Sequence, residues 1–559
     1  MAERPFAWEK SYPQGVRWDV AFKPATITDM FVASVAANGP RPAIEFRDQT
    51  IIYRDLGARV AGAAATLQRL GFGPGTSVAL YLPNHPWHPI AFFGALQAGA
   101  RVVHLSPLDA ERTLRHKLTD SSARILVTVD IEPFVGMALK LMDAGVIDRV
   151  VACPDDAWGI GPEPATALPD RPGLSRFDAV AATADRWPLV KPDDIALLQY
   201  TGGTTGLPKG AMLSHGNLMA ALQMYEAWYG GQGVVRRGAE RVICALPLFH
   251  IYALTTILLK QISNGNEIML RTRFDVAATL RDIEVKRATA FSGVPTMWIA
   301  LANLPGIEAR DFSSLQLCTS GGAPLPIEVQ QRFERLTGHR LGGGWGMTET
   351  SPAGTLIPIF GPTKTGTVGM PLPGIEMDVV ALDNPTHVLP PGETGEIRIK
   401  GPNVTRGYWG QPEASAEAFV DGRFLTGDVG YMDEDGFFFL VDRKKDLIIS
   451  GGFNVYPAMI EQAIYEHTSV AEAVVVGIAD EYRGEAAKAF VTLRPGAPTF
   501  SLDELRAFLA GKVGRHEMPA ALEFRDSLPR TPVGKLSRLD LRNEERARQN
   551  QSSPAGERP

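Results

Sequence analysis

The hydrophobic residues in the first third of the chain form short apolar runs that alternate with segments of helical periodicity. Residues 78–81, 102–105 and 125–129 are β-type runs. Helix-like segments at 87–97 and 110–118 separate them. Such alternation is typical of βαβ units around a parallel sheet. The pattern therefore predicts an α/β architecture for this part of the chain.

The pattern changes twice further along the chain. Between about residues 365 and 440, short strands alternate with Gly, Pro and Asp, which indicates a β-rich subdomain. A charged segment at 442–446 follows, and a second α/β alternation begins after it. We therefore predict a boundary there, between an N-terminal region of residues 1–441 and a small α+β domain of residues 447–545. The polar tail, residues 546–559, is predicted to be disordered.

The most apolar window, residues 242–259, is interrupted by a proline and by His250. This window predicts a buried strand that runs into a core helix, and not a membrane span. The first ten residues lack the apolar stretch of a signal peptide. Cys153, Cys244 and Cys318 lie far apart, so the sequence contains no CxxC motif and no disulfide framework. A reducing cytoplasm is the expected location.

The composition is that of a globular protein with a large core. The chain has 559 residues, of which 45% are hydrophobic and 21% charged, and its net charge is −6. These values exclude a disordered chain, a collagen-like repeat and a generally basic protein, so we expect no nucleic-acid partner. Any polyanionic ligand must be held by local cations, because the overall field is mildly unfavourable to it.

The strongest motif is a loop rich in glycine and threonine that directly follows the apolar residues 195–198. The loop consists of Thr201, Gly202, Gly203, Thr204, Thr205, Gly206, Leu207, Pro208 and Lys209. Glycine lets backbone N–H groups approach phosphate closely, threonine hydroxyls add donors and metal ligands, and Lys209 supplies a cation. A Walker A loop would have Ser or Thr after the lysine, whereas Gly210 stands here. A flexible surface loop is the alternative interpretation.

A second motif combines an aromatic residue between glycines with oxygen-bearing side chains. It consists of Gly344, Trp345, Gly346, Met347, Thr348 and Glu349, preceded at some distance by Gly322, Ala323 and Pro324. The tryptophan can present a flat face to a base, and Thr348 with Glu349 offers ligands for a hard cation. The alternative is a core tryptophan and a solvent-exposed glutamate.

Three further side chains are candidates for contacts with a nucleotide. Asp428 can accept hydrogen bonds from a ribose diol, and Arg443 can reach a phosphate or the same sugar. Lys535 follows a loop shaped by Pro and Gly that could deliver it into a distant site. In isolation, Asp428 could equally be a turn residue, and an exposed loop lysine is the more common interpretation of a residue such as Lys535.

Together, in this order and spacing, these motifs resemble the adenylate-forming superfamily, which comprises acyl-CoA synthetases, adenylation domains of peptide synthetases and beetle luciferases. The resemblance spans the chain from about Trp8 to Arg538. Within the superfamily, Thr319-Ser-Gly-Gly322 and Gly346-Met-Thr-Glu-Thr-Ser-Pro352 look most like medium- or long-chain fatty-acid–CoA ligases. The resemblance implies two half-reactions: a carboxylate attacks the α-phosphate of ATP, and the thiol of coenzyme A then attacks the acyl-adenylate.

The resemblance also implies a role for each motif. The loop from Thr201 to Lys209 matches the family's phosphate loop, and Thr201 and Glu349 match its Mg²⁺ ligands. Trp345 would lie against adenine, Asp428 would bind the ribose hydroxyls, and Thr348 a phosphate. The implied ATP- and AMP-binding residues outside the phosphate loop are Gly322, Ala323, Pro324, Gly344, Trp345, Gly346, Met347, Thr348, Asp428 and Arg443. The implied catalytic residues are Lys209, Glu349 and Lys535.

In this resemblance Lys535 matches the lysine that bridges the substrate carboxylate and the α-phosphate. Lys445 matches the residue about which a mobile C-terminal domain rotates between the half-reactions. Rotation would bring Gly451 and Gly452 to a tunnel for the pantetheine arm of coenzyme A. Ile449 stands where several relatives carry a lysine, so a role of that lysine is not transferred to this chain.

The acyl pocket is less clearly marked. His250 matches a segment that lines the substrate in relatives, where it could guard the carboxylate, and a core histidine is the alternative. Leu254 stands where some long-chain relatives carry a tryptophan gate. The string Leu-Phe-His-Ile-Tyr-Ala-Leu also resembles 4-coumarate–CoA ligases, which keeps aryl acids open as substrates.

The expected reaction is therefore the ligation of a fatty acid to coenzyme A, with ATP and coenzyme A as co-substrates and Mg²⁺ as the metal. Three alternatives stay open: ligation of aryl or dicarboxylic acids, loading of a carrier-protein thiol, and a non-catalytic nucleotide-binding protein. A peripheral membrane contact and a homodimer are both compatible with the sequence.

Overall fold

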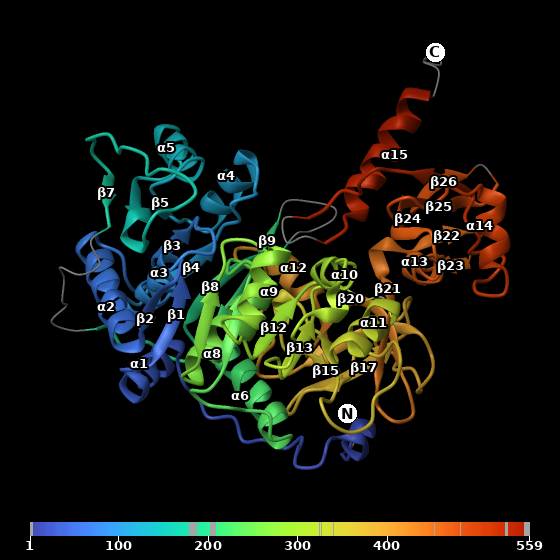
Figure 1. The fold of residues 1–559 in the computed structure, drawn as a ribbon, viewed down its shortest axis with the longest axis horizontal. Helices are drawn as coiled ribbons and strands as arrows, with labels where there is room; N and C mark the ends of the chain where they lie inside the picture. The colour runs from blue at the N-terminus through green and yellow to red at the C-terminus, as the bar shows by residue number, and fades with distance from the viewer. Residues whose placement is uncertain are drawn as a thin grey trace.

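The structure is a computed structural model with a mixed α/β fold, and its described residues form four sheets. It describes residues 4–177, 187–201, 208–323, 325, 327–338, 340–451, 453–480, 482–531 and 535–552. Figure 1 shows a large N-terminal part, coloured from blue to orange, and a smaller C-terminal part in orange and red to one side of it.

The first large sheet has seven strands in the order β7-β6-β5-β3-β4-β8-β9, and only the β8–β9 pair is antiparallel. The strands are β3 (Ser77–Leu80), β4 (Arg101–His104), β5 (Ile125–Val129), β6 (Arg149–Cys153), β7 (Leu174–Arg176), β8 (Ile195–Thr201) and β9 (Lys209–Ser214). The helices beside them are α3 (Trp87–Gln97), α4 (Glu111–Asp120) and α5 (Phe134–Asp143). The βαβ units predicted from the apolar runs are confirmed.

The second large sheet has nine strands in the order β16-β15-β14-β13-β12-β10-β11-β1-β2. The strands are β1 (Pro42–Phe46), β2 (Gln49–Ile52), β10 (Arg241–Cys244), β11 (Glu267–Leu270), β12 (Ala290–Gly293), β13 (Leu317–Ser320), β14 (Leu341–Trp345), β15 (Thr355–Leu356) and β16 (Met370–Pro371). The associated helices are α1 (Ile27–Asn38), α2 (Tyr53–Arg69), α6 (His215–Gly231), α7 (Ile251–Ala253), α8 (Lys260–Ser263), α9 (Val276–Glu284), α10 (Pro295–Ala302) and α11 (Ile327–Thr337).

The largest hydrophobic cluster contains residues from both sheets and from α3, whose eleven residues are all buried. The most apolar window of the sequence forms the buried strand β10 and then a π-helix at Leu254–Leu259, as predicted apart from the helix type. Within the described part of the chain, no helix is both long and apolar enough to cross a bilayer.

An antiparallel sheet of five strands follows, which we call the β-rich sheet because the Gly, Pro and Asp pattern predicted a β-rich subdomain here. Its strands are β17 (Glu376–Val380), β18 (Gly395–Lys400), β19 (Phe419–Val420), β20 (Arg423–Met432) and β21 (Phe438–Arg443). Their order is β17-β18-β20-β19, with β21 also paired to β20. The short helix α12 (Pro412–Glu417) precedes β19. The β20–β21 pairing sets Asp428 directly opposite Arg443.

The C-terminal part forms its own sheet, with the order β23-β22-β25-β24 and β26 paired to β25. The strands are β22 (Ile448–Ser450), β23 (Phe453–Val455), β24 (Val470–Asp480), β25 (Gly484–Leu493) and β26 (Ala521–Phe524). The helices are α13 (Pro457–Tyr465), α14 (Leu502–Leu509) and α15 (Arg538–Ser552). Ser501 and Glu504 form the capping box of α14.

The tail prediction needs a correction, because α15 continues through residues 546–552. The sequence of this segment is polar, which suggested disorder, but Arg548 forms ion pairs with Glu545 in the same helix and with Glu523 in β26. These contacts extend the helix beyond the last apolar turn. Residues 553–559 lie outside the described part of the chain.

Arg538, at the start of α15, forms ion pairs both with the 442–446 segment and with α13 of the C-terminal part. Its guanidinium lies 2.7 Å from Asp442 and 2.5 Å from Glu461, and its side chain is 18% exposed. Burial opposes its charge, but Glu461 and Asp442 outweigh burial and raise the pKa of Arg538. The charges of Asp442 and Glu461 are therefore compensated by the one guanidinium of Arg538.

We expect Arg538→Ala to lower the free energy of unfolding of the C-terminal part by about 3–5 kcal/mol, because it leaves two carboxylates without their buried cation. Urea unfolding of the full chain, followed by circular dichroism, measures this. Arg548→Ala, in the same helix with a side chain that is 50% exposed, is the matched control. Equal effects of the two substitutions would contradict the prediction.

Candidate active site

Several predicted site segments begin at the carboxyl ends of strands. β8 ends at Thr201, and the parallel neighbours β13 and β14 end at Ser320 and Trp345. The carboxyl ends of parallel strands are where open α/β sheets bind ligands. The sheets therefore place the two glycine motifs that follow β13 and β14 at one edge.

The phosphate-loop motif is described only at its two ends. Thr201 and Lys209 face each other in the β8–β9 register, and the Thr201 hydroxyl lies 3.5 Å from the Lys209 carbonyl oxygen. The Lys209 ammonium lies 5.2 Å from the centroid of the Tyr408 ring. The predicted site residues Gly202, Gly203, Thr204, Thr205, Gly206, Pro324 and Gly452 lie outside the described residues.

Glu349 is buried, contrary to the solvent-exposed alternative, with 5% of its surface accessible. The Tyr408 hydroxyl donates a hydrogen bond of 2.9 Å to its Oε1 atom. Burial raises the pKa of Glu349, and the bond from Tyr408 partly counteracts that rise. A buried carboxylate held in this way is a suitable oxygen ligand for a hard divalent cation.

At Gly344 and Gly346, shortly before Glu349, the backbone packs too closely for any residue but glycine. A Cβ atom on Gly346 would lie 1.6 Å from the Pro352 carbonyl oxygen, and one on Gly344 would lie 2.2 Å from the Thr355 carbonyl oxygen. The glycines therefore allow the chain to fold back on itself between β14 and β15. Met347 and Thr348 lie in this turn, where the Met347 N–H donates to the Thr350 hydroxyl at 3.0 Å.

Trp345, Asp428 and Arg443 form one connected group. The Trp345 indole N–H donates to Asp428 at 2.7 Å, and the Arg443 guanidinium lies 2.5 Å from the other oxygen of Asp428. Trp345 is 7% exposed and belongs to a hydrophobic cluster, as the interpretation of Trp345 as a core residue predicted. Asp428 is 4% exposed, and its carboxylate is oriented by two donors from different strands.

Lys535 reaches from the C-terminal part to the N-terminal glycines. A Cβ atom on Gly322, whose φ is +80°, would lie 3.2 Å from Cε of Lys535. The two residues line a small cavity together with Leu246, Pro247, His250, Tyr252, Ala253 and Val294. Lys535, Gly322 and the predicted acyl-pocket residue His250 thus line the same cavity.

Burial lowers the pKa of both basic residues of this cavity, His250 and Lys535, but to different values. Burial, followed by the charge of Lys535, lowers the pKa of His250 to about 3, so its imidazole is neutral. His250 Nδ1 accepts a hydrogen bond of 3.2 Å from the Tyr252 N–H, which places the imidazole proton on Nε2. Burial, and then Arg443, lower the pKa of Lys535 to about 8, while Asp428 acts in the opposite direction.

A reaction that needs the Lys535 ammonium should therefore fail at alkaline pH. We expect kcat/KM for ATP–pyrophosphate exchange to decrease above a pH of about 8, since deprotonation removes the positive charge. Lys535→Arg should move this limb to higher pH, because a guanidinium stays protonated there. Exchange assays between pH 6 and 10 measure the shift, and an unchanged limb in Lys535→Arg would assign it to another group.

The segment predicted to act as a hinge lies between contacts to both parts of the chain. Lys444 pairs with Glu396 of β18 at 2.8 Å, whereas Asp446 pairs with Arg542 of α15 at 2.6 Å. Lys445 lies between them and is exposed. Gly451 has a φ of +58°, and its N–H donates to the Arg483 carbonyl oxygen at 2.8 Å.

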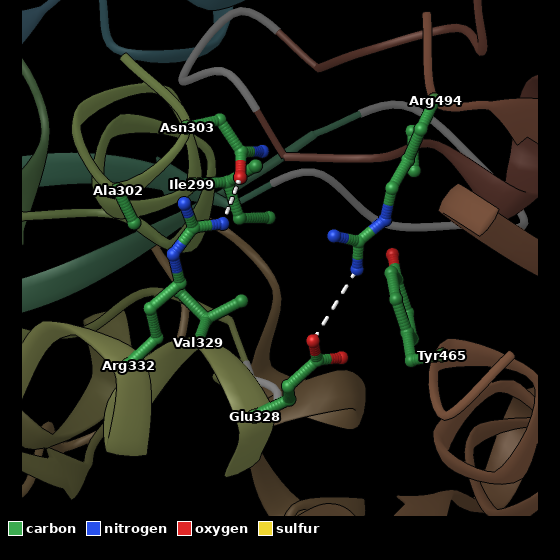
Figure 2. A pocket seen from close by; sticks show the side chains of 9 residues that line it. Ile299, Ala302, Asn303, Glu328, Val329, Arg332, Tyr465 and Arg494 are labelled. Carbon is green, nitrogen blue, oxygen red and sulfur yellow. Dashed lines mark hydrogen bonds and ion pairs between the residues drawn. The ribbon is translucent and has the colours of Figure 1, made fainter. Parts of the chain in front are cut away.

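A cleft separates α10 and α11 from the C-terminal sheet (Figure 2). It is lined by Ile299, Ala302, Asn303, Glu328, Val329, Arg332, Tyr465, Ala471 and Arg494. Arg494, directly after β25, points across the cleft to Glu328 of α11 at 3.4 Å. Arg332 of α11 donates to Asn303, directly after α10, at 2.7 Å. The Glu328–Arg494 ion pair joins the two parts of the chain.

Sequence reasoning missed Tyr408, which contacts two of the predicted catalytic residues. Tyr408 is 59 positions from Glu349, in an irregular segment before α12. Neither periodicity nor a motif marks it. The one available signal is an aromatic residue that follows Gly407, where a backbone turn is expected.

Comparisons with known proteins show the family to which the chain belongs. Residues 31–409 match the AMP-binding enzyme family, and residues 459–535 match the AMP-binding enzyme C-terminal domain. The first match covers more than half of the chain. The chain therefore belongs to the AMP-binding enzyme family, and the resemblance to adenylate-forming enzymes is confirmed.

Its relatives include named ligases over nearly their full length. The chain is 37% identical over 554 residues to a long-chain-fatty-acid–CoA ligase of Bacillus subtilis, which covers 96% of this chain and 98% of the relative. It is also 37% identical over 505 residues to a feruloyl-CoA synthase of Amycolatopsis, at 89% and 95% coverage.

Solved structures have the same fold. ATP-bound MatB from Rhodopseudomonas palustris has a TM-score of 0.80 at 29% identity, covering 93% of this chain and 99% of that one. The o-succinylbenzoate CoA synthetase of Bacillus subtilis, in complex with its acyl-adenylate intermediate, has a TM-score of 0.77 at 27% identity, with 93% and 98% coverage. The predicted fold class is confirmed.

Proposed function

We propose that this chain ligates a medium- or long-chain fatty acid to coenzyme A in two ATP-dependent steps, releasing pyrophosphate and AMP. The observation that carries this proposal is the insertion of Lys535 from the C-terminal part beside Gly322 and His250. A cation from the C-terminal part thus lies beside a glycine that follows β13, which supports a role for Lys535 in neutralising the charges of the reactants. The full-length relatives named long-chain-fatty-acid–CoA ligases support the choice of substrate.

In the first step two anions must meet, so their charges have to be neutralised. Lys209 would bind the phosphates of ATP. Lys535 would lie between the acyl carboxylate and the α-phosphate, where it stabilises the charge that develops in the transition state. Neutral His250 would donate from Nε2 to the carboxylate and hold it in the cavity.

The nucleotide would bind along the edge formed by β13 and β14. Asp428 would accept hydrogen bonds from the ribose hydroxyls, with Arg443 beside it, and Thr348 would contact a phosphate. Trp345 is buried, and its indole N–H already donates to Asp428. Adenine would therefore contact only one face or edge of the indole. The glycines Gly322, Gly344 and Gly346 would let the backbone approach the base closely.

Thr201 and Glu349 would hold Mg²⁺, which supplies charge neutralisation to the phosphates when bound. The buried carboxylate of Glu349 fits this role, because an ionised group kept from solvent requires a compensating partner. The described residues contain no group of three or more His, Cys, Asp or Glu side chains suited to a metal. The remaining ligands would therefore come from ATP itself and from water.

In the second step the C-terminal part would rotate about Lys445 and withdraw Lys535 from the cavity. Gly451 and Gly452 would then line the tunnel for the pantetheine arm of coenzyme A. This is a domain movement that exchanges active-site parts between half-reactions. We place the reaction in the cytoplasm, with a peripheral contact to membranes in which fatty acids dissolve.

The Glu328–Arg494 ion pair would favour the arrangement in which Lys535 is inserted. Its side chains are 53% and 35% exposed, and such pairs contribute about 0–1 kcal/mol. We expect Arg494→Ala to slow adenylation by up to about fivefold and to leave thioester formation from a supplied acyl-adenylate unchanged or faster. Arg506→Ala, on α14, is the control. Equal slowing of both steps would contradict a role in domain positioning.

The feruloyl-CoA synthase relative keeps aryl acids open as substrates, and dicarboxylates and a carrier-protein thiol are further alternatives. A coenzyme A consumption assay over C4–C18 fatty acids, two aryl acids and one dicarboxylate discriminates among the acids. A maximum at C8 or longer supports the proposal. A preference for an aryl acid would revise the substrate, and acid-dependent ATP–pyrophosphate exchange without coenzyme A consumption would indicate a carrier-protein acceptor.

A further inference from the structure

We propose that Tyr408 is a positioning residue for adenylation, which fixes the metal-binding carboxylate Glu349 relative to the phosphate-loop lysine Lys209. This inference rests on the proposed function of those two residues. It concerns a side chain to which neither the motifs nor the resemblance gives a role.

The backbone around Tyr408 connects the two motifs directly. We call residues 402–409 the bridging segment. On one side, the Thr405 N–H donates to the Glu349 carbonyl oxygen at 2.7 Å. On the other side, the Trp409 N–H donates to the Gly210 carbonyl oxygen at 2.8 Å, and Tyr408 itself forms an antiparallel bridge with Ala211 of β9. The bridging segment therefore holds the Glu349 turn against the strand that begins with Lys209.

Two further contacts make this connection rigid. The Asn403 amide donates to the carbonyl oxygens of Thr350 and Ala353 at 2.7 and 2.6 Å, and Asn403 is fully buried. Gly407 has a φ of +132°, and a Cβ atom there would lie 2.6 Å from the Ser415 hydroxyl oxygen. These contacts fix the backbone on the N-terminal side of Tyr408, and therefore the point from which its side chain extends.

The side chain of Tyr408 makes two separate contacts with the site. Its hydroxyl donates to Glu349 Oε1 at 2.9 Å, which fixes the rotation of the carboxylate and directs the second oxygen. The Lys209 ammonium lies over its ring, 5.2 Å from the ring centroid, within the range of a cation–π interaction. One phenol thus orients a carboxylate through its hydroxyl and an ammonium through its ring.

This division allows the two contacts to be removed one at a time. Tyr408→Phe keeps the ring and deletes only the hydroxyl, whereas Tyr408→Leu deletes both. Tyr431→Phe is the matched control, since Tyr431 stacks on Phe439 in the β-rich sheet. Melting temperatures of the three variants report any loss of stability.

The first readout is binding and needs no turnover. Mn²⁺ binding to the enzyme–ATP complex is followed by electron paramagnetic resonance, and ATP binding with and without Mg²⁺ by calorimetry. We expect Tyr408→Phe to weaken Mn²⁺ binding about tenfold and to leave metal-free ATP affinity within about twofold, because only the carboxylate has lost its donor. Tyr408→Leu should weaken both, because Lys209 also loses its ring.

The second readout separates the half-reactions. Acyl-dependent ATP–pyrophosphate exchange by Tyr408→Phe should decrease about tenfold at limiting Mg²⁺ and recover at saturating Mg²⁺. Thioester formation from supplied acyl-adenylate should be unchanged. Wild-type Mn²⁺ binding in Tyr408→Phe would overturn the proposal, and so would equal loss in both half-reactions together with a lowered melting temperature.

The proposed function can fail independently of this inference. If the wild type shows no acid-dependent exchange with any acid of the panel, the proposed ligation is wrong. Binding of Mn²⁺ and ATP would still test whether Tyr408 orients Glu349.

Discussion

Lys535→Ala is expected to lower the rate of acyl-dependent ATP–pyrophosphate exchange by about two to three orders of magnitude, the effect of removing a fixed group that stabilises transition-state charge. Thioester formation from a supplied acyl-adenylate should stay within about twofold of the wild type, since the proposed rotation withdraws Lys535 from the cavity before the second step. The split arises because Lys535 belongs to the C-terminal part yet lies beside Gly322 of the N-terminal part. Isotope exchange and a coenzyme A release assay measure the two steps.

Lys512→Ala is the control for this experiment, because Lys512 pairs with Glu466 on the surface of the same domain. It should leave both half-reactions unchanged. A comparable loss of both steps in Lys535→Ala would refute the assignment of Lys535 to adenylation alone. Loss of neither would place Lys535 outside the reaction.

Glu349→Gln is expected to reduce exchange by about two orders of magnitude and to raise the Mg²⁺ concentration that gives half-maximal rate. Glutamine keeps an oxygen that can accept from Tyr408 but carries no negative charge, so the change tests charge and preserves shape. The effect should be large because Glu349 is buried, where a charge interacts with a cation far more strongly than at the surface.

Glu376→Gln serves as the control for loss of a glutamate charge, since Glu376 pairs with Arg423 at 2.7 Å in β17, away from the predicted site residues. A magnesium titration of each variant, with Mn²⁺ binding to the ATP complex as a second measurement, checks the expectation. If Glu349→Gln keeps the wild-type magnesium dependence, Glu349 is not a metal ligand.

Local features of the fold could be predicted from the sequence because neighbouring residues determine them. The alternation of apolar runs predicted β3, β4 and β5, and the Ser501–Glu504 pair predicted the start of α14. Both signals depend on residues a few positions apart. The glycine motifs were recognised in the same way, from residue types at short spacing, whereas the role predicted for Lys535 came from the family resemblance.

Contacts between distant segments could not be predicted in this way. Nothing local pairs Asp428 with Arg443 across β20 and β21, or directs the Trp345 indole to the same carboxylate. Tyr408 reaches Glu349 only because the bridging segment lies against β9. Such proximity results from the sheet order and the loop paths, which residue spacing alone does not contain.

The three cysteines of the chain have a practical consequence for measuring the proposed rotation. All three are free and buried. Burial raises the pKa of Cys244 and Cys318 to about 12 and holds the pKa of Cys153 well above its usual value, so none is a reactive thiolate at neutral pH. Cysteines introduced at Leu108 and Tyr482, which are 66% and 95% exposed, would therefore react alone with maleimide dyes. A donor and an acceptor attached there would report the distance between the two domains during turnover, with every native thiol left in place.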